Sequence, residues 1–230
     1  MLERRVGLIG GLSWESTTSY YRYFHEYFSS GVSEWSQPRL LIDSLDFGEI
    51  VALQQIGDWA ATGDIMADSA RRLEGAGASV LGIGANTMHI NFDVVRDAVD
   101  IAVIDVRDAV ANEAIAGGHS SIALLGTKYL LERSFYSDRL KELGVRPVKP
   151  TSDEADQLQE IIYAELTHGI VTDASRDYLR AVTAACFDRG ATAVGLCCTE
   201  FGLLMDESEP YAVIDSTKAH VRALLAAAAA

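Results

Sequence analysis

The sequence of 230 residues predicts an α/β protein of two pseudo-symmetric lobes, each a parallel sheet flanked by helices. Three observations predict this class. Short apolar runs alternate with amphipathic stretches, which is the pattern of βαβ units. The runs end at glycine or polar residues, as strands buried on both faces do. The two halves of the chain also carry similar segments at similar spacing.

The first expected strand, residues 6–9, is a mostly apolar run that ends at Gly10 and Gly11. An aromatic-rich helix is expected next, with Tyr20, Tyr21 and Phe24. Further strands are expected at residues 39–45, 79–83 and 101–106. Between them, residues 58–75 carry a partial apolar stripe at helical spacing, which predicts an amphipathic helix.

The later part of the chain repeats this order. Strands are expected at residues 121–125, 192–197 and 211–214, and a helix with Tyr129 and Tyr136 follows the first of them. Residues 153–166 have apolar side chains at helical spacing, and a helix is expected over 178–189. The last helix, 215–230, is expected to return to the first lobe. The predicted lobes are therefore residues 1–100 with 215–230, and residues 101–214.

Two pairs of turns in the repeat indicate where a ligand would bind. Gly11 and Ala85 follow expected strands of the first lobe, and Thr127 and Cys198 follow expected strands of the second at nearly the same spacing. Ligands in parallel sheets bind beyond the carboxyl ends of the strands. We therefore expect these turns to face one cleft between the lobes, where the active site would lie.

Charge and cysteine content narrow the class of protein. The net charge of −14 and pI near 4.7 argue against nucleic acid and anionic membranes as partners, because phosphate groups would be repelled. Three cysteines, two of them adjacent, are not a disulfide framework, and no zinc-ligand spacing is present. No signal peptide or membrane-length apolar segment is seen, so a cytoplasmic location is expected.

The familiar cofactor motifs are missing. Gly7, Gly10 and Gly11 do not form the dinucleotide fingerprint, and no acidic residue closes a clear ribose site, so NAD is rejected. The phosphate-loop motif is absent as well. Neither Lys128 nor Lys218 lies in a pattern that indicates a Schiff base to pyridoxal phosphate, although the sequence leaves that possibility open. We expect no cofactor and no metal.

Cys198 is the first candidate for chemistry. It follows a buried strand at an expected helix start, where unpaired N–H groups and the helix dipole stabilise a thiolate. The plain alternative is a buried, inert cysteine. If the strand persists, Cys197 and Cys198 point to opposite faces, so at most one faces the cleft. Cys186, on an expected helix, is interpreted as a packing residue.

Polar residues surround the same turns. Asn86 and Thr87, like Thr199 in the other lobe, are able to hold a carboxylate with backbone N–H groups and short side chains. Simple helix capping is the competing interpretation, and it applies equally to Ser13 and Thr127. From the residues alone, capping is favoured. Gln54, His89 and Glu165 are most simply solvated or structural polar residues.

Taken together, these segments resemble the aspartate/glutamate racemase family over nearly the whole chain. The resemblance rests on Gly10 to Thr17, Asn86-Thr87-Met88-His89, Leu125-Gly126-Thr127 and Cys198-Thr199-Glu200. The sequence is most similar to the bacterial broad-specificity and L-Asp/Glu-specific racemases. The resemblance implies two lobes with the active site between them, often a homodimer, and cofactor-independent inversion at the Cα of a small amino-acid substrate.

The resemblance also assigns residues. In the family, each lobe supplies one cysteine, and the two cysteines act on opposite faces of Cα. Cys198 matches the cysteine of the second lobe. Asn86, Thr87, Thr127 and Thr199 match positions that hold the substrate carboxylates. Further substrate-contacting positions match Leu12, Ser13, Gln54 and Glu165, where Glu165 would hold the substrate ammonium. Some aspartate racemases have basic residues near Glu49 and Glu165, so strict aspartate specificity is not expected.

Ala85 departs from the family pattern. It occupies the first-lobe cysteine position, and alanine has no proton to exchange. Three interpretations remain open: a natural one-cysteine racemase with water or a hydroxyl as second acid, an engineered Cys→Ala variant, or a one-base decarboxylase of malonates. A non-catalytic amino-acid binder is a further alternative. The racemase is preferred because the sequence beside Ala85 stays racemase-like.

Overall fold

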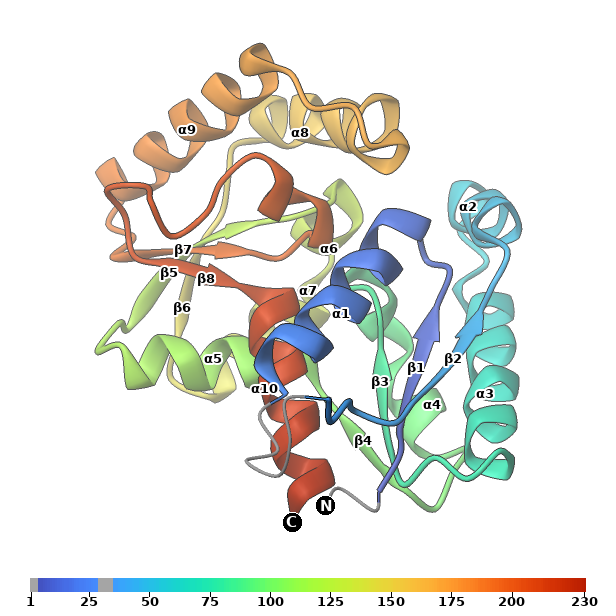
Figure 1. Ribbon diagram of the computed structural model, residues 1–230. Helices are drawn as coiled ribbons and strands as arrows, with labels where there is room; N and C mark the ends of the chain where they lie inside the picture. Colours follow the sequence, from blue (N-terminus) through green and yellow to red (C-terminus); the bar gives the residue numbers. More distant parts are fainter. Residues whose placement is uncertain (1–3, 29–34) are drawn as a thin grey trace. The chain divides into compact units, whose positions relative to one another are not determined.

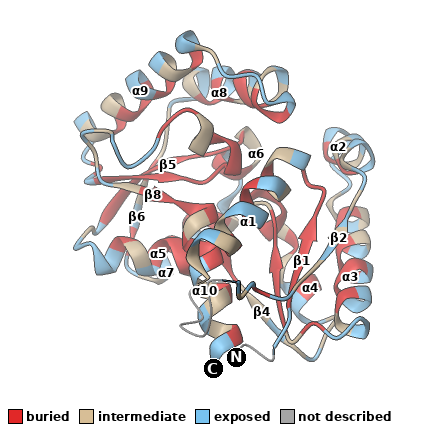
Figure 2. Cartoon of the chain, in the orientation of Figure 1, coloured by how far each residue is buried: buried red, intermediate tan, exposed pale blue. Residues whose placement is uncertain are grey.

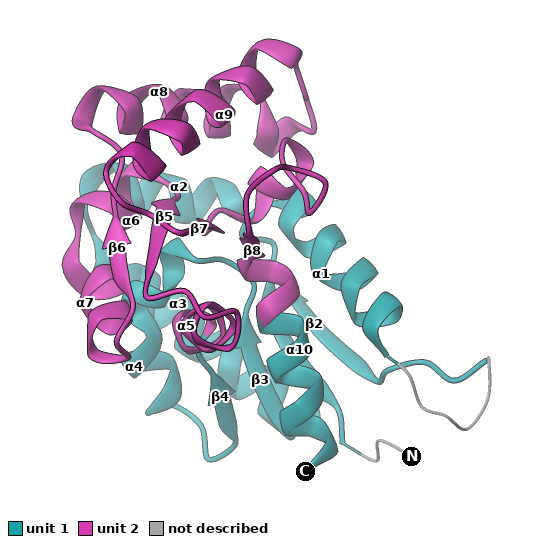
Figure 3. Ribbon diagram, turned by 90° about the vertical axis from the view of Figure 1, so that its left-hand side faces the viewer, with its two compact units in different colours: residues 1–105, 220–230 teal, residues 106–219 magenta. Residues whose placement is uncertain are grey.

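The computed structural model describes residues 4–28 and 35–230, which divide into two compact units (Figure 3). Unit 1 comprises Met1–Asp105 and His220–Ala230, and unit 2 comprises Val106–Ala219. The predicted boundary near residue 100 assigned the strand expected at 101–106 to the second lobe. Strand β4 (Ala102–Ile104) instead pairs with β3 (Val80–Ile83), which keeps it in the first sheet.

Unit 1 contains a parallel sheet of four strands in the order β2-β1-β3-β4 (Figure 1). Strands β1 (Val6–Gly10) and β3 are fully buried, whereas the edge strand β2 (Leu40–Ser44) is partly exposed. On one face pack apolar residues of α3 (Trp59–Gly75), such as Met66 and Leu73. The other face is covered by α1 (Trp14–Tyr27) and α10 (Ser216–Ala229). The remaining helices are α2 (Phe47–Ile56), the 3-10 helix η1 (Thr87–Asn91) and α4 (Phe92–Arg96).

Unit 2 repeats this arrangement with the strand order β6-β5-β7-β8, again parallel throughout. Its strands are β5 (Ser121–Leu125), β6 (Arg146–Val148), β7 (Ala193–Leu196) and β8 (Val213–Asp215). Residues of α8 (Ser152–Ala164) and α9 (Asp173–Asp188) pack on one face, and residues of α5 (Val106–Ala116) and α7 (Ser134–Glu142) on the other. Shorter elements complete the unit: α6 (Lys128–Glu132), η2 (Leu166–His168) and η3 (Thr199–Leu203). The central strands are buried in both units (Figure 2).

The α/β class and the two parallel sheets flanked by helices are confirmed. Strand β6 was not expected, because Arg-Pro-Val is short and proline cannot donate to a ladder. Its place at a sheet edge, beside β5 only, accommodates that proline. The helix expected around Tyr129 and Tyr136 is interrupted at Arg133, whose extended backbone separates α6 from α7.

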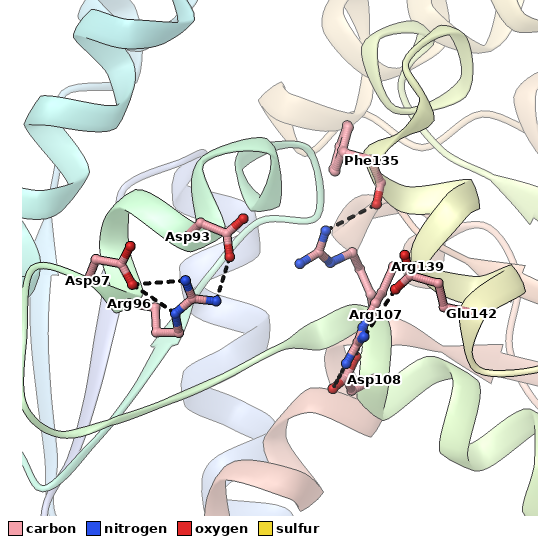
Figure 4. A network of polar contacts seen from close by, with 8 residues as sticks. All are labelled: Asp93, Arg96, Asp97, Arg107, Asp108, Phe135, Arg139 and Glu142. Atoms are coloured by element: carbon pink, nitrogen blue, oxygen red, sulfur yellow. Dashed lines mark hydrogen bonds and ion pairs between the residues drawn. The ribbon is translucent and has the colours of Figure 1, made fainter.

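Each unit also contains charged contacts between partly or largely exposed side chains (Figure 4). In unit 1, Arg96 binds Asp93 and Asp97 near the end of α4. In unit 2, Arg139 of α7 binds Asp108 of α5 through two hydrogen bonds of 2.7 and 2.8 Å. Exposed pairs of this kind each contribute about 1 kcal/mol or less, so the apolar cores dominate folding. Across the described ranges, no helix combines the length and apolar character needed to span a bilayer.

Candidate active site

The pairing register places Ala85 and Cys198 at equivalent positions of the two sheets. Ile9 pairs with Ile83 in unit 1, and Leu125 pairs with Leu196 in unit 2. Ala85 and Cys198 each lie two residues beyond the paired residue of β3 or β7. In both sheets the neighbouring strand is the first in its unit, so each turn lies at the topological switch point, where open parallel sheets bind ligands.

The turn after β1 is strained. Gly11 has φ of 70°, and a Cβ there would lie 2.2 Å from the Leu45 carbonyl oxygen. Ser13 has φ of 124°, the only non-glycine residue with positive φ in the described ranges. Thr17 holds this geometry, because its hydroxyl accepts from Gly11 N at 2.8 Å and donates to the Ser13 carbonyl at 3.0 Å. Strain maintained by surrounding contacts is found at ligand-binding sites more often than elsewhere.

The capping interpretation holds for some of the polar turn residues and fails for others. Ser13 accepts from the backbone N–H of Ser16 to cap α1, and Thr127 accepts from Leu130 to cap α6. Asn86 precedes η1 but makes no side-chain capping hydrogen bond. Asn86, Thr87 and Thr199 are all buried. Capping therefore accounts for the side chains of Ser13 and Thr127 but not for that of Asn86.

Three other predicted residues have defined surroundings. Gln54 on α2 is buried, and its amide nitrogen contacts the sulfur of Met88 at 3.2 Å, so it lies beside the turn that contains Ala85. Leu12 packs in the core of unit 1. The carboxylate of Glu165 accepts hydrogen bonds from Ser175 at 2.5 Å and Thr172 at 3.3 Å, which ties it to the start of α9.

Cys198 has an acidic neighbour, Glu200, to which the sequence alone assigns no role. Its thiol donates to Oε2 of Glu200 at 3.1 Å, and the Thr199 hydroxyl donates to the same oxygen at 2.7 Å. All three residues are buried. The only sequence signal for this contact is the short spacing in Cys-Thr-Glu. That spacing does not reveal that the Glu200 carboxylate turns back onto the Cys198 sulfur. An acceptor is thus in place for the thiol proton.

This environment opposes the thiolate that was expected at a helix start. Burial, followed by the negative charge of Glu200, raises the pKa of Cys198 well above its usual value. The Glu200 backbone N–H acts in the opposite direction but is outweighed. Element η3 is a 3-10 helix of only five residues, so its dipole is weak. The resting state of Cys198 is therefore a thiol.

The neighbouring cysteines differ from Cys198. Cys197 packs in the core cluster on the opposite face of the sheet from Cys198, as strand alternation predicts. Burial raises its pKa to about 12. Cys186 is fully buried on α9, in agreement with a packing role. In residues 4–28 and 35–230, no group of three His, Cys, Asp or Glu side chains is arranged to hold a metal ion.

Comparisons with known proteins agree on one family. The sequence model of the Asp/Glu/hydantoin racemase family matches residues 9–224. The structure is similar to a candidate Asp/Glu racemase from Yersinia pestis, with TM-score 0.89, 33% identity and coverage of 99% of this chain and 100% of that one. It is also similar to an aspartate racemase homologue from Pyrococcus horikoshii, with TM-score 0.84, 32% identity and coverage of 99% and 100%.

A more distant similarity concerns the fold alone. Arylmalonate decarboxylase aligns with TM-score 0.55 and 15% identity, covering 97% of this chain and 92% of that one.

Proposed function

The chain belongs to the Asp/Glu/hydantoin racemase family, and we propose on that premise that it is a cofactor-independent amino-acid racemase whose base toward the L-enantiomer is Cys198. The observation that carries the proposal is the hydrogen bond from the Cys198 thiol to Glu200 at a switch-point turn. A buried thiol beside a carboxylate has a route to lose its proton, which an inert packing cysteine lacks.

The proposed proton transfers balance with these groups. Glu200 accepts the thiol proton, and the resulting thiolate removes the proton from Cα. The electron pair left on carbon delocalises into the substrate carboxylate, which becomes enediolate-like. Asn86, Thr87 and Thr127 are proposed to donate hydrogen bonds to that carboxylate as its charge grows, which lowers the barrier. Thr199 is proposed to contribute through its backbone, because its hydroxyl already donates to Glu200.

Ala85 determines how the second proton is delivered. It stands where a second cysteine would serve the opposite face of Cα, and a methyl group has no exchangeable proton. We propose that a hydroxyl or a water molecule supplies that proton and is itself reprotonated by the proton held on Glu200, which restores both groups. Turnover from the D-enantiomer is then the slower direction. Leu12, Ser13, Gln54 and Glu165 are proposed to contact the substrate, a polar amino acid such as Asp or Glu. A homodimer is the proposed assembly.

Exchange of the Cα proton tests this function directly. The protein is incubated with L-Asp, L-Glu and other polar L-amino acids in deuterated water, and the Cα signal is followed by NMR. Exchange is expected with at least one of them. Cys198→Ser is expected to remove it, whereas Cys186→Ser, a matched change of a buried cysteine in the same unit, retains it. Folded protein that exchanges no amino acid would refute the proposal.

Ala85 favours a second candidate, a one-base decarboxylase of substituted malonates. Loss of carbon dioxide generates the same enediolate charge and needs one acid on one face only. The shared fold with arylmalonate decarboxylase is compatible with it, at an identity that carries no functional weight. Carbon dioxide release from an arylmalonate, without Cα exchange of any amino acid, would select this reaction. Calorimetric binding of an amino acid without either reaction would indicate a binder.

A further inference from the structure

His89 makes two contacts with the turn that contains Ala85. Its ring nitrogen Nδ1 lies 2.9 Å from the carbonyl oxygen of Ala85, and its backbone N–H donates to the Asn86 carbonyl at 3.1 Å. A carbonyl oxygen only accepts, so Nδ1 must carry the proton and donate it. One buried residue therefore holds two successive carbonyl groups of the turn.

The His89 ring is itself held on two sides. It stacks on Phe92, with ring centroids 5.9 Å apart and planes within 10°. The ring of His220, on α10, meets it edge-on at 5.8 Å. His220 is fixed in turn, because one ring nitrogen lies 2.8 Å from the Ile104 carbonyl and the other 2.8 Å from the Tyr20 hydroxyl. These contacts leave the His89 ring little freedom to rotate.

The protonation of His220 is determined by these partners. Nε2 must donate to the Ile104 carbonyl, so Nδ1 carries no proton and accepts a hydrogen bond from the Tyr20 hydroxyl. Burial, followed by the neighbouring His89, lowers the pKa of His220 to about 3. The ring beside His89 is therefore neutral near pH 7, and it supports His89 by packing without adding charge.

We infer that His89 is a positioning residue that orients Asn86 through the hydrogen bond from its Nδ1 to the Ala85 carbonyl. The peptide between Ala85 and Asn86 is trans, so fixing the carbonyl fixes the plane of the peptide and points the Asn86 N–H away from the ring. Together with the φ of −68° at Asn86, this plane sets the direction in which the Asn86 side chain leaves the backbone. This inference rests on the proposed function, in which Asn86 holds the substrate carboxylate.

The expected kinetic signature follows from the chemistry. A misdirected Asn86 side chain stabilises the transition state less than before, because negative charge on the substrate carboxylate is greatest there. We therefore expect kcat to fall more than KM rises. Misplacement of a binding group by about 1 Å is sufficient to lower the rate roughly 100-fold. A residue that served only the stability of unit 1 would lower the melting temperature and leave kcat of the folded protein unchanged.

Two substitutions separate donation at Nδ1 from simple volume. In His89→Asn the side-chain amide nitrogen takes the place of Nδ1 and is able to donate to the Ala85 carbonyl. In His89→Gln the amide lies farther out, near the place of Nε2. Exchange rate of the Cα proton, kcat and KM are measured for both variants, with His119→Asn as a matched histidine substitution in unit 2. The Asn86 backbone amide signal, read by NMR without substrate, reports the geometry of the turn independently of activity.

We expect His89→Asn to keep kcat within about threefold of the wild type and His89→Gln to lose 10- to 100-fold, figures on the order of those for groups that orient a binding residue. The Asn86 signal is expected to shift only in His89→Gln. Equal kcat in both variants, whether high or low, would overturn the inference. If the wild type exchanges no amino acid, the proposed function fails separately, and an unshifted Asn86 signal in His89→Gln would still overturn the positioning role.

Discussion

The thiol of Cys198 donates a hydrogen bond to the carboxylate of Glu200, with 3.1 Å between Sγ and Oε2. This relationship makes the cysteine a weaker acid and at the same time provides the acceptor for its proton. A thiol with a raised pKa is protonated at rest, so it becomes a base only if a neighbour takes its proton.

Replacing the acceptor is expected to stop the reaction. Glu200→Gln keeps the shape of the side chain but is unable to take the thiol proton, so kcat/KM for Cα exchange should fall by about 100-fold or more, the usual contribution of a general base. Glu209→Gln, which removes the carboxylate paired with Arg180 elsewhere in unit 2, is the control and should retain activity. Full activity of Glu200→Gln would show that another group receives the proton.

Alkylation should report the raised pKa of Cys198. Because only the thiolate reacts, labelling by iodoacetamide is expected to be slow near pH 7 and to accelerate as the pH rises above the usual range of a thiol. Glu200→Gln removes the negative charge that disfavours the thiolate, so its Cys198 should be labelled faster at the same pH. Peptide mapping by mass spectrometry measures this. Rapid labelling of the wild type at pH 7 would contradict the protonated resting state.

Supplying the missing acid should change the direction of turnover. Ala85→Cys places a thiol at the position equivalent to Cys198, so activity on the D-enantiomer is expected to increase relative to the L-enantiomer. The measurement is the initial rate of Cα exchange from each enantiomer, and Ala85→Ser is the matched variant with a weaker acid. If Ala85→Cys folds and gains nothing, the second proton does not come from this position.

Ser13 should limit stability. Its φ of 124° costs roughly 1–3 kcal/mol for a residue with a side chain, whereas exchanging a serine cap for glycine costs only a few tenths. Ser13→Gly is therefore expected to raise the free energy of unfolding by about 1 kcal/mol. Ser13→Ala keeps the strain and loses the cap, so it should lower that free energy by about 1 kcal/mol. Urea denaturation of both variants tests this, and the reverse order would contradict it.

His220 should make stability depend on pH. Its pKa is lowered to about 3 in the folded chain, so the unfolded chain binds its proton first as the pH falls below 6.5. The stability that neutral His220 contributes is complete above pH 6.5 and decreases by about 1.4 kcal/mol per unit toward pH 3. Comparison with His220→Gln, which is able to keep the Ile104 hydrogen bond, removes the effects of other groups. The difference in unfolding free energy should shrink by about 2 kcal/mol between pH 7.5 and pH 5.

Most of the fold could be predicted because each buried parallel strand is recognisable from its own short run of apolar residues. Each expected strand overlaps one of the strands formed, and the repeat of the two halves appears as the same strand order in both sheets. Strand β6 was missed because Pro147 is unfavourable in a strand and the segment is short. The place of β4 was missed as well, because pairing with β3 is a contact between distant segments that no local pattern records.

The sequence names the residues of the candidate site but not their chemical state. Order along the chain establishes which residues follow the central strands, the equivalence of the Ala85 and Cys198 turns, and the family. The protonation of Cys198, the backbone strain at Ser13 and the support of the Ala85 turn by His89 depend on contacts that form only on folding. Burial and hydrogen bonding set these properties, and they join residues as distant as Tyr20 and His220, which are 200 positions apart in the chain.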